Sequence, residues 1–325
     1  MSRVRIAVVG TNFISDRFAE AASLSGKAEV SAVYSRKLDT GAAFAAKHGI
    51  KKVYDSYEKM LADSEIDAVY IASPHIAHAE QTVAALDAGK HVLCEKMIAA
   101  DLEGFLFQKA AMQRSGKVLL EAMRPDFDPA LEIIKAALPR LGKIRRVHLE
   151  YCQYSSRYDR FLAGEVLNAF NPKMKNTALA DIGIYPLHIC VLLFGAPDRI
   201  GGESVFLSNG FEGMGAITMG YGDMLAEIVY SKITESVNPS VIEGENGSIT
   251  IDKLNAPTEI KLKMRGEEWQ TLDYTPIENN MVYEIDAFAD MVGGVSSFSP
   301  YFEATEGAMR VVDEVYRTRE ITKYF

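Results

Sequence analysis

The chain has 325 residues, of which 48% are hydrophobic and 24% charged, and its formal net charge is −9. This composition is typical of a globular protein with a sizeable core, and the length favours two domains. The acidic balance and the lack of a long basic run argue against a nucleic-acid binder. We therefore expect a protein that acts on a small molecule.

The amino-terminal segment Met1–Gly10 is typical of a strand and not of a signal peptide. No run of about 18 apolar residues is present, so we expect no membrane span. The cysteines Cys94, Cys152 and Cys190 have neither disulfide-framework nor metal-site spacing. The sequence thus predicts a cytoplasmic protein with reduced thiols and no bound metal.

The first 122 residues alternate short apolar runs with amphipathic stretches of helical length. The expected strands are Val4–Val9, Val30–Tyr34, Ala68–Ala72, His91–Cys94 and Val118–Glu121. The expected helices are Ile14–Ser25, Thr40–His48, Tyr57–Ala62, Ile76–Ala88 and Leu102–Ser115. Alternation of this kind predicts right-handed crossovers and a doubly wound parallel sheet.

From residue 123 onward, strand-like segments with period-two alternation follow one another, which predicts antiparallel pairing. The expected strands are Arg146–Tyr154, Ile200–Ser208, Gly215–Tyr221, Met224–Lys232, Pro239–Glu243, Ser248–Asp252, Glu259–Met264 and Trp269–Tyr274. The expected helices are Pro129–Leu138, Asn280–Met291 and Thr305–Thr318. We predict an α/β protein: a Rossmann domain over residues 1–122, then an α+β domain over 123–325 with a large, mostly antiparallel open sheet.

The turn after the first strand has the setting of a dinucleotide fingerprint, a strand followed by a turn and a helix. Asn12 and Ser15 occupy two of the glycine positions of that pattern. Asparagine tolerates positive φ, serine is small, and the helix start offers N–H groups to a pyrophosphate. A tight turn in an unrelated α/β protein is the alternative. The candidate cofactor residues here are Gly10, Thr11, Asn12, Phe13 and Ile14.

The second strand ends in Ser35, Arg36 and Lys37. A site for NAD(H) usually carries an acidic residue there, whereas arginine suits the 2′-phosphate of NADP(H). We therefore expect NADP(H) to be favoured over NAD(H). The alternative is that these cations are simply hydrated.

The expected strand His91–Cys94 delivers an adjacent Glu95-Lys96 pair at its carboxyl end. Ligands of open parallel sheets bind in the crevice beyond the strand carboxyl ends, and packing poorly explains charges there. Lys96 is therefore the first candidate for catalysis.

Three segments together carry a family resemblance. The first segment is Ile71–His75, which is followed by His78 and Glu80. The second is Ala88–Lys96, which resembles a Glu-Lys-Pro motif except that Met97 replaces the proline. The third is Asp181–Pro186, which matches the pattern Asp-x-Gly-x-His/Tyr. With these motifs the chain resembles the glucose–fructose oxidoreductase, inositol dehydrogenase and MocA family over essentially its whole length. A tyrosine in the third motif resembles the dihydrodiol dehydrogenase branch.

The resemblance implies an NAD(P)-dependent dehydrogenase or reductase acting on a CH–OH group of a sugar, polyol or vicinal diol. It implies Lys96 as the catalytic lysine, with Asp181 and Tyr185 completing the site. It also implies a homodimer or homotetramer formed through the carboxyl-terminal sheet. The residues it implies beside the nicotinamide are Ser73, Pro74, His75, His78, Glu95 and Lys96.

The spacing of the third motif has a meaning of its own, since residues four apart share one helix face. Pro186 suits a first turn, so we expect a helix that begins within Ile182–Tyr185 with Asp181 at its cap. Tyr185 would exchange the substrate proton while Lys96 bonds the same oxygen, or Lys96 would carry the proton itself. The alternatives are that Asp181 is an ordinary N-cap and Tyr185 a core residue.

The loops Tyr154–Arg160 and Asn168–Pro172 mix aromatic and polar side chains that suit sugar rings or polyols. They are equally well explained as exposed loops, and Arg157 could simply pair with Asp159. The candidate substrate residues are Arg157, Tyr158, Asn171 and His188 besides Lys96, Asp181 and Tyr185. His188, one turn beyond Tyr185, is more typical of a structural histidine.

Two rival functions remain open at this point. One is a keto-sugar reductase with a tightly held cofactor, and the other is a regulator that senses NADP(H) without turnover. Lys96, Asp181 and Tyr185 together argue against the regulator, because a sensor has no need of proton-transfer groups.

Overall fold

The structure, a computed structural model, describes residues 3–325. Contacts divide the chain into two compact units. The first runs to Phe127 and takes in Glu278–Phe302, and the second consists of Asp128–Ile277 and Glu303–Phe325. The boundary expected from the sequence had assigned everything after residue 122 to the second domain. The described residues contain no helix both long and apolar enough to cross a membrane.

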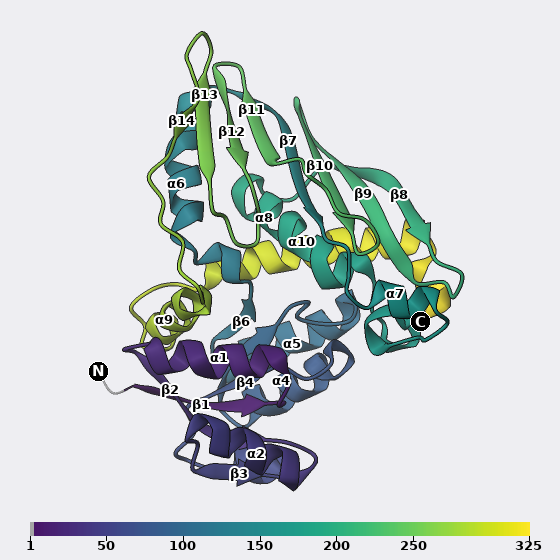
Figure 1. The fold of residues 1–325 in the computed structure, drawn as a ribbon. Helices are drawn as coiled ribbons and strands as arrows, with labels where there is room; N and C mark the ends of the chain where they lie inside the picture. The colour runs from purple at the N-terminus through teal and green to yellow at the C-terminus, as the bar shows by residue number, and fades with distance from the viewer. Residues whose placement is uncertain (1–2) are drawn as a thin grey trace. The chain divides into compact units, whose positions relative to one another are not determined.

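The first unit contains a parallel sheet of six strands in the order β3-β2-β1-β4-β5-β6 (Figure 1). Its strands are β1 Val4–Val9, β2 Ala28–Tyr34, β3 Lys52–Tyr54, β4 Ala68–Ile71, β5 His91–Glu95 and β6 Leu119–Ala122. Its helices are α1 Phe13–Leu24, α2 Leu38–His48, α3 Tyr57–Leu61, α4 His78–Asp87, α5 Leu102–Ser115 and α9 Met281–Val292, with short turns η1 His75–Ala77 and η2 Arg124–Asp126. This confirms the predicted doubly wound sheet.

Helix α9 belongs to the first unit because its apolar face completes the core there. Met281, Ile285 and Phe288 recur at helical spacing and are each 0% exposed. They share one cluster with Ile6 and Tyr70 of the parallel sheet, and α9 packs on α1. Burial of large apolar side chains is worth roughly 1.5–3 kcal/mol each, so this helix contributes substantially to the stability of the first unit.

The second unit contains eight strands in the order β14-β13-β12-β11-β7-β10-β9-β8. The strands are β7 Ile144–Cys152, β8 Arg199–Phe206, β9 Glu212–Tyr221, β10 Met224–Ser231, β11 Ser240–Gly244, β12 Gly247–Ile251, β13 Ile260–Met264 and β14 Gln270–Thr271. The helical elements are α6 Pro129–Ala137, η3 Leu138–Leu141, α7 Tyr158–Leu162, η4 Asn168–Phe170, η5 Pro172–Met174, η6 Leu179–Gly183, α8 Ile184–Phe194, α10 Ser299–Thr318 (whose first residues belong to the first unit) and η7 Ile321–Tyr324. Only β7 and β10 pair in parallel among these strands, so the predicted, mostly antiparallel sheet is confirmed.

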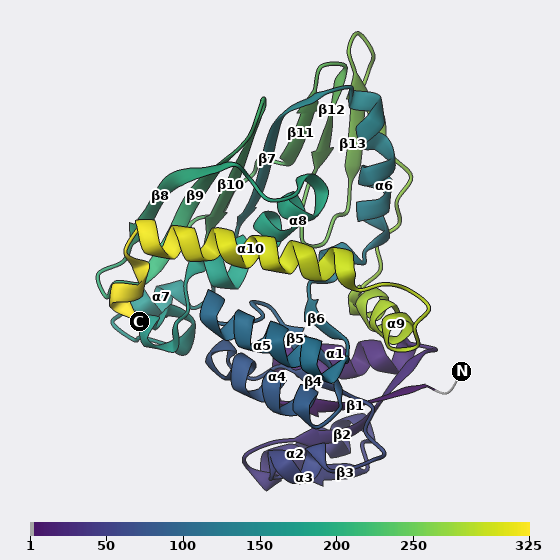
Figure 2. The ribbon, with the colours of Figure 1, turned by 180° about the vertical axis from the view of Figure 1, so that it is seen from behind.

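The two faces of the eight-stranded sheet differ in chemistry. Figure 2 shows α6 and α8 on one face, and β7 turns Val147 and Leu149, both 0% exposed, into the buried layer. The alternating residues Arg146 and His148 stay partly exposed. Period-two alternation therefore produces one apolar face and one polar face, as it does in half-covered antiparallel sheets.

Candidate active site

The turn after β1 lies at the point where the strand order of the parallel sheet reverses, between β1 and β4. Gly10 has φ +108°, and a Cβ there would lie 3.0 Å from the carbonyl oxygen of Ala72. Two features therefore require glycine at position 10: the positive φ and the lack of space for a Cβ. Ligands of doubly wound sheets bind at this reversal, so the turn is correctly located for a dinucleotide.

Asn12 does not take the positive φ expected of a glycine substitute. Its φ is −89°, and it caps α1 instead: its Oδ1 accepts from the N–H groups of Ile14 and Ser15, both at 3.1 Å. Its Nδ2 donates to the oxygen of Ala72 at 2.8 Å, which fastens the turn to the end of β4. The tolerance of asparagine for positive φ is therefore not used at this position, and Asn12 serves as a helix cap. Ser15 is fully buried, as its small size allows.

These residues fit the pyrophosphate of a dinucleotide. The missing Cβ at Gly10 leaves room for close approach, and α1 begins directly after the turn at Phe13, whose ring is 75% exposed. The helix start is electropositive, which favours an anion. Asn12 already satisfies the N–H groups of Ile14 and Ser15, so those two groups contribute mainly through the helix dipole.

The end of β2 forms a small hydroxyl cluster. Ser35 and Thr40 share a hydrogen bond of 2.7 Å, and the Ser35 hydroxyl accepts from the N–H of Lys37 at 3.3 Å. Arg36 and Lys37 are exposed beside it. Two hydroxyls and two cations are the groups that a phosphate monoester prefers.

His78 joins the two loops that follow β4 and β5. Its ring is 1% exposed, with Nε2 2.8 Å from the oxygen of Ser73 and Nδ1 2.9 Å from the oxygen of Met97. Burial lowers the pKa of His78 to about 4, so at neutral pH the ring is uncharged and its single N–H donates to one of these two carbonyls. The Ser73 hydroxyl donates to Oε1 of Gln81 at 2.6 Å, which fixes the loop that continues into Pro74 and His75.

Glu95 is the last residue of β5 and is 8% exposed. The hydroxyl of Tyr70 donates to its Oε1, and the N–H of Lys96 donates to its Oε2 at 3.3 Å. Burial raises the pKa of Glu95, while the Tyr70 hydrogen bond opposes the rise. Tyr70 in turn stacks on Phe18, with ring centroids 3.7 Å apart. Lys96 follows directly and is partly exposed, so a rigid buried carboxyl underlies the candidate lysine.

Met97 occupies the position at which the related motif has proline. It is 0% exposed, and the segment around it is held by buried hydrogen bonds. The N–H of Ile98 donates to Glu121 at 2.8 Å, and its carbonyl accepts from Gln108 at 2.8 Å. Hydrogen bonds to buried side chains therefore fix this segment of the chain, although methionine by itself is flexible.

In the second unit, Asp181 lies inside a π-helical turn, η6, that continues into α8. The α-helix α8 begins at Ile184, within the expected range 182–185, but Asp181 is not its cap. The helical turns begin earlier, where the Thr177 hydroxyl accepts from the N–H of Ala180 at 2.9 Å. The N–H of Leu179 is satisfied by Glu212 at 3.0 Å. Pro186 is the third residue of α8 and therefore lies in its first turn, as the sequence predicted. π-turns such as η6 are frequent at functional sites.

The glycine of the third motif is explained by a close approach. A Cβ on Gly183 would lie 2.6 Å from Cγ of Tyr230, a fully buried residue of β10. The turn that carries Asp181 therefore rests directly on the sheet. Any side chain at position 183 would push it away.

Asp181 forms an ion pair that sequence reasoning missed. Its Oδ2 lies 2.8 Å from Nζ of Lys232, whose side chain is only 4% exposed, while that of Asp181 is 35% exposed. Lys232 directly follows strand β10, just as Lys96 follows β5. The sequence signal for Lys232 is the one that indicated Lys96, a charged residue directly after a strand. From the sequence, this signal was used only for the parallel sheet.

Tyr185 lies on α8 and is 6% exposed, with its ring centroid 5.9 Å from that of Tyr151. His188 is 1% exposed, and its Nε2 lies 3.1 Å from the hydroxyl of Thr305. The structural role of His188 is therefore favoured over a substrate contact.

The candidate substrate loops form an aromatic cluster. The ring of Tyr158 stacks with those of Phe161 and Phe170 at centroid distances of 6.1 and 5.7 Å. Asp159 accepts from the hydroxyl of Tyr154 at 2.6 Å. Arg157 is exposed. Asn171 caps the short turn η5 by accepting from the N–H of Lys173 at 3.1 Å, which gives it a structural role.

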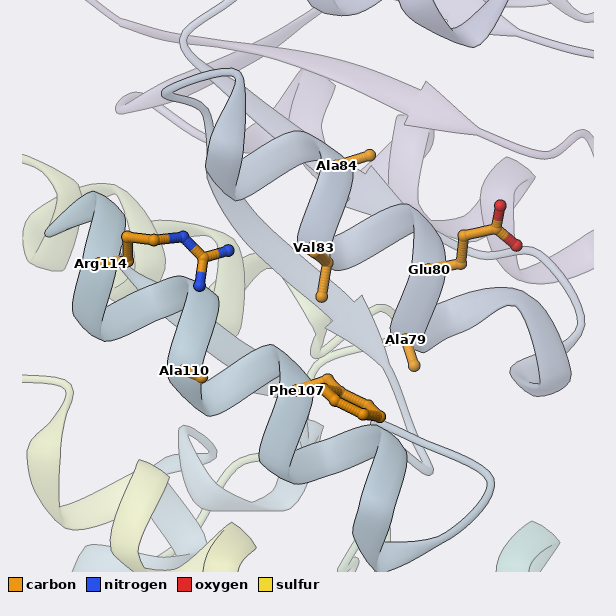
Figure 3. Close-up of a pocket in the computed structure, with 7 residues that line it drawn as sticks. All are labelled: Ala79, Glu80, Val83, Ala84, Phe107, Ala110 and Arg114. Carbon is orange, nitrogen blue, oxygen red and sulfur yellow. The ribbon is translucent and has the colours of Figure 1, made fainter.

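An apolar furrow also lies between α4 and α5. Figure 3 shows Ala79 and Val83 of α4 directed toward α5, which carries Phe107. Neither Glu95 nor Lys96 lines the furrow, and it is separate from the candidate active site. Its lining residues are Ala79, Glu80, Val83, Ala84, Phe107, Ala110 and Arg114.

Within the first unit the structure thus gathers the Gly10 turn, the Ser73 loop and Glu95-Lys96 at the carboxyl edge of one sheet. Within the second unit it gathers Asp181, Lys232 and the aromatic cluster. Comparison with known proteins agrees with this arrangement. Residues 4–123 match the model of an oxidoreductase family with an NAD-binding Rossmann fold, and residues 136–250 match the GFO/IDH/MocA carboxyl-terminal domain. The chain belongs to the GFO/IDH/MocA family.

Relatives within the GFO/IDH/MocA family match almost end to end. The chain is 37% identical over 313 residues to scyllo-inositol 2-dehydrogenase (NADP(+)) IolU of Bacillus subtilis, covering 96% of this chain and 95% of that protein. It is 28% identical to mouse trans-1,2-dihydrobenzene-1,2-diol dehydrogenase, covering 82% and 80%. The solved aldose-aldose oxidoreductase of Caulobacter crescentus, 18% identical, has the same fold with a TM-score of 0.88 over 98% of each chain. The protein is therefore an NAD(P)-dependent oxidoreductase.

Proposed function

We propose that the protein interconverts a CH–OH group and a carbonyl on a sugar, polyol or vicinal diol. The observation that carries this proposal is Lys96, which emerges at the carboxyl end of β5 directly after the buried carboxyl of Glu95. The names of an inositol dehydrogenase and a dihydrodiol dehydrogenase among the relatives support the substrate class.

We assign Lys96, Asp181 and Tyr185 to act on one substrate oxygen. A bound nicotinamide would supply or take the hydride. During oxidation the substrate hydroxyl loses its proton as the C–H bond breaks, and negative charge builds on that oxygen. The Lys96 ammonium stabilises this charge by a hydrogen bond, Tyr185 accepts the proton, and Asp181 orients the pair.

The test is turnover of a panel of aldoses, polyols and cyclic diols, followed as NADPH formation. We expect Tyr185→Phe to lower kcat by about 10²-fold or more, because one acid–base group supplies about 10²–10⁴ in rate. Tyr151→Phe is the matched control, since Tyr151 is the neighbouring phenol. Equal kcat for wild type and Tyr185→Phe would remove Tyr185 from the mechanism and leave Lys96 as the proton carrier.

The preferred cofactor is proposed to be NADP(H). Support comes from the hydroxyl pair Ser35–Thr40 and the exposed cations Arg36 and Lys37 at the end of β2. We expect Arg36→Ala to lower the kcat/KM ratio of NADP to NAD about tenfold, the size of one charge-assisted hydrogen bond. Lys59→Ala, an exposed lysine elsewhere in this unit, should leave the ratio unchanged.

We also propose a homodimer or homotetramer formed through the polar face of the eight-stranded sheet, and a cytoplasmic location. That face carries ordered ion pairs of Arg146 with Glu227 at 2.7 Å and with Glu243 at 3.1 Å. The cysteines are free thiols, as a reducing compartment would keep them. Sedimentation at micromolar concentration tests the assembly: a wild-type monomer overturns it, and Arg146→Glu should weaken a true oligomer.

A further inference from the structure

Lys232 is a buried ammonium with an unusual set of partners. Its Nζ lies 2.8 Å from Oδ2 of Asp181 and donates to the oxygen of Ala169 at 2.6 Å. The same ammonium lies over the rings of Phe170 and Phe211, at 4.7 and 5.1 Å from their centroids. A buried charge is costly unless it is paired and hydrogen-bonded, so each of these contacts fixes its position.

The backbone of Lys232 ties further segments to the same point. Its N–H donates to the oxygen of Gly213 at 2.9 Å, and its carbonyl accepts from the N–H of Ser155 at 2.9 Å. Ser155 begins the loop that carries Arg157 and Tyr158, and Ala169 lies in the loop before Asn171. Lys232 therefore contacts both candidate substrate loops, Tyr154–Arg160 and Asn168–Pro172 (together the aromatic loops), and the carboxylate of Asp181.

We propose that Lys232 is a positioning residue of the active site, which holds the Asp181 carboxylate at one oxygen and locks both aromatic loops around it. The proposal rests on the function proposed above. The two partners differ in burial: the Lys232 side chain is only 4% exposed, whereas that of Asp181 is 35% exposed. Lys232 acts through Asp181 and does not itself meet the substrate.

The test is a double-mutant cycle of Lys232→Met and Asp181→Asn, read out in kcat and KM. We expect Lys232→Met to lower kcat about tenfold to a hundredfold, the usual cost of a misplaced reacting group. In the Asp181→Asn background the same change should cost clearly less than in the wild type, because the carboxylate that Lys232 positions is already altered and only the contacts with the Ala169 loop are lost. Lys173→Met, at an exposed lysine of the adjacent loop, is the matched control and should match wild type.

Fully multiplicative losses in the cycle, or a wild-type kcat in Lys232→Met, overturn the proposal. If Lys232→Met does not fold, Lys232→Arg and Lys232→Gln take its place, and equal activity of these two contradicts a role for the charge. If the wild type oxidises nothing in the panel, the proposed function fails separately. The same cycle is then read in Tm, where additive shifts overturn the pairing with Asp181.

Discussion

Each unit sets a lysine just beyond a strand and next to a carboxylate, but the two pairs are built in opposite senses. In the first unit Glu95 is 8% exposed and Lys96 is partly exposed. In the second, the Lys232 side chain is 4% exposed and that of Asp181 is 35% exposed. The buried member is the carboxyl in one pair and the ammonium in the other.

This difference in burial separates a supporting residue from a residue that can contact a ligand in each pair. A buried charged group is held by every partner around it, because the low local dielectric makes each contact strong. Its neighbour is partly exposed and is held in place by the buried group. In the mechanism proposed above, Lys96 and Asp181 are the members of each pair that face the substrate, and Glu95 and Lys232 support them. Burial, more than residue type, distinguishes the two roles.

The largest expected effect is at the exposed lysine of the first pair. Lys96→Met should lower kcat by about 10²–10⁴-fold, because it removes the group proposed to bond the substrate oxygen. The Kd for NADPH, measured by fluorescence titration, should change little, since the Gly10 turn and the Ser35 cluster are untouched. Wild-type-like turnover in this variant would break the comparison at once.

The next effect tests the contact between the turn that carries Asp181 and strand β10. Gly183→Ala forces a methyl group to within 2.6 Å of the Tyr230 ring. Overpacking of this kind costs typically about 1–3 kcal/mol, and the displaced turn should also lower kcat. Urea unfolding measures the loss. Gly26→Ala is the control, because nothing lies within 4 Å of a Cβ there; a loss as large at Gly26 would mean that the contact is not the cause.

A smaller effect is expected at the support of the first pair. Tyr70→Phe removes the hydroxyl that donates to the buried Glu95, and an unsatisfied buried acceptor costs about 1–2 kcal/mol. Because this hydrogen bond opposes the rise in the pKa of Glu95, the pKa should rise further and the cost should be larger at pH 8 than at pH 5. Chemical denaturation at the two pH values checks this. A cost independent of pH would contradict a titration of Glu95 between these two pH values.

The smallest effect concerns Glu284 of α9, a buried carboxyl whose two oxygens have no hydrogen-bond partner among residues 3–325. Burial raises its pKa well above the ordinary 4.5. Its stabilising contribution is therefore full below pH 4.5 and is lost as pH rises through the folded-state pKa. Glu284→Gln does not titrate, so its unfolding free energy relative to wild type should increase from pH 5 to pH 8.

The same measurement on Glu80→Gln supplies the control, because Glu80 is exposed. A flat difference between Glu284→Gln and wild type across this pH range would contradict the assignment of a raised pKa.

The elements of the first unit were predictable because apolar runs bounded by glycine carry local information. β1 was predicted to the residue, and β5 and β6 to within a residue at each end. The short edge strand β3 was missed because Lys52–Tyr54 is half-buried and has no apolar run. Fold class is readable from such repeated local signals even when single strands are not.

Residues of the candidate site could be proposed from the sequence only where a motif is continuous. Asp181 and Tyr185 stand four residues apart, so their spacing could be read. The start of α8 at Ile184 was predicted, but Asp181 was wrongly expected to be its cap, because the π-turn η6 precedes α8 and contains Asp181. Lys232 was missed because its partner is distant along the chain, and only the fold of the second unit brings the two together.

Helix α9 has a consequence for how the protein is made. The first unit begins with the first strand, yet Met281, Ile285 and Phe288, which its core needs, are translated after almost the whole second unit. During synthesis the parallel sheet therefore lacks the part of its apolar core that α9 supplies. A fragment ending at Phe127 should behave as a loosely packed, aggregation-prone chain, and in the cell this stretch is where a chaperone has the longest time to bind.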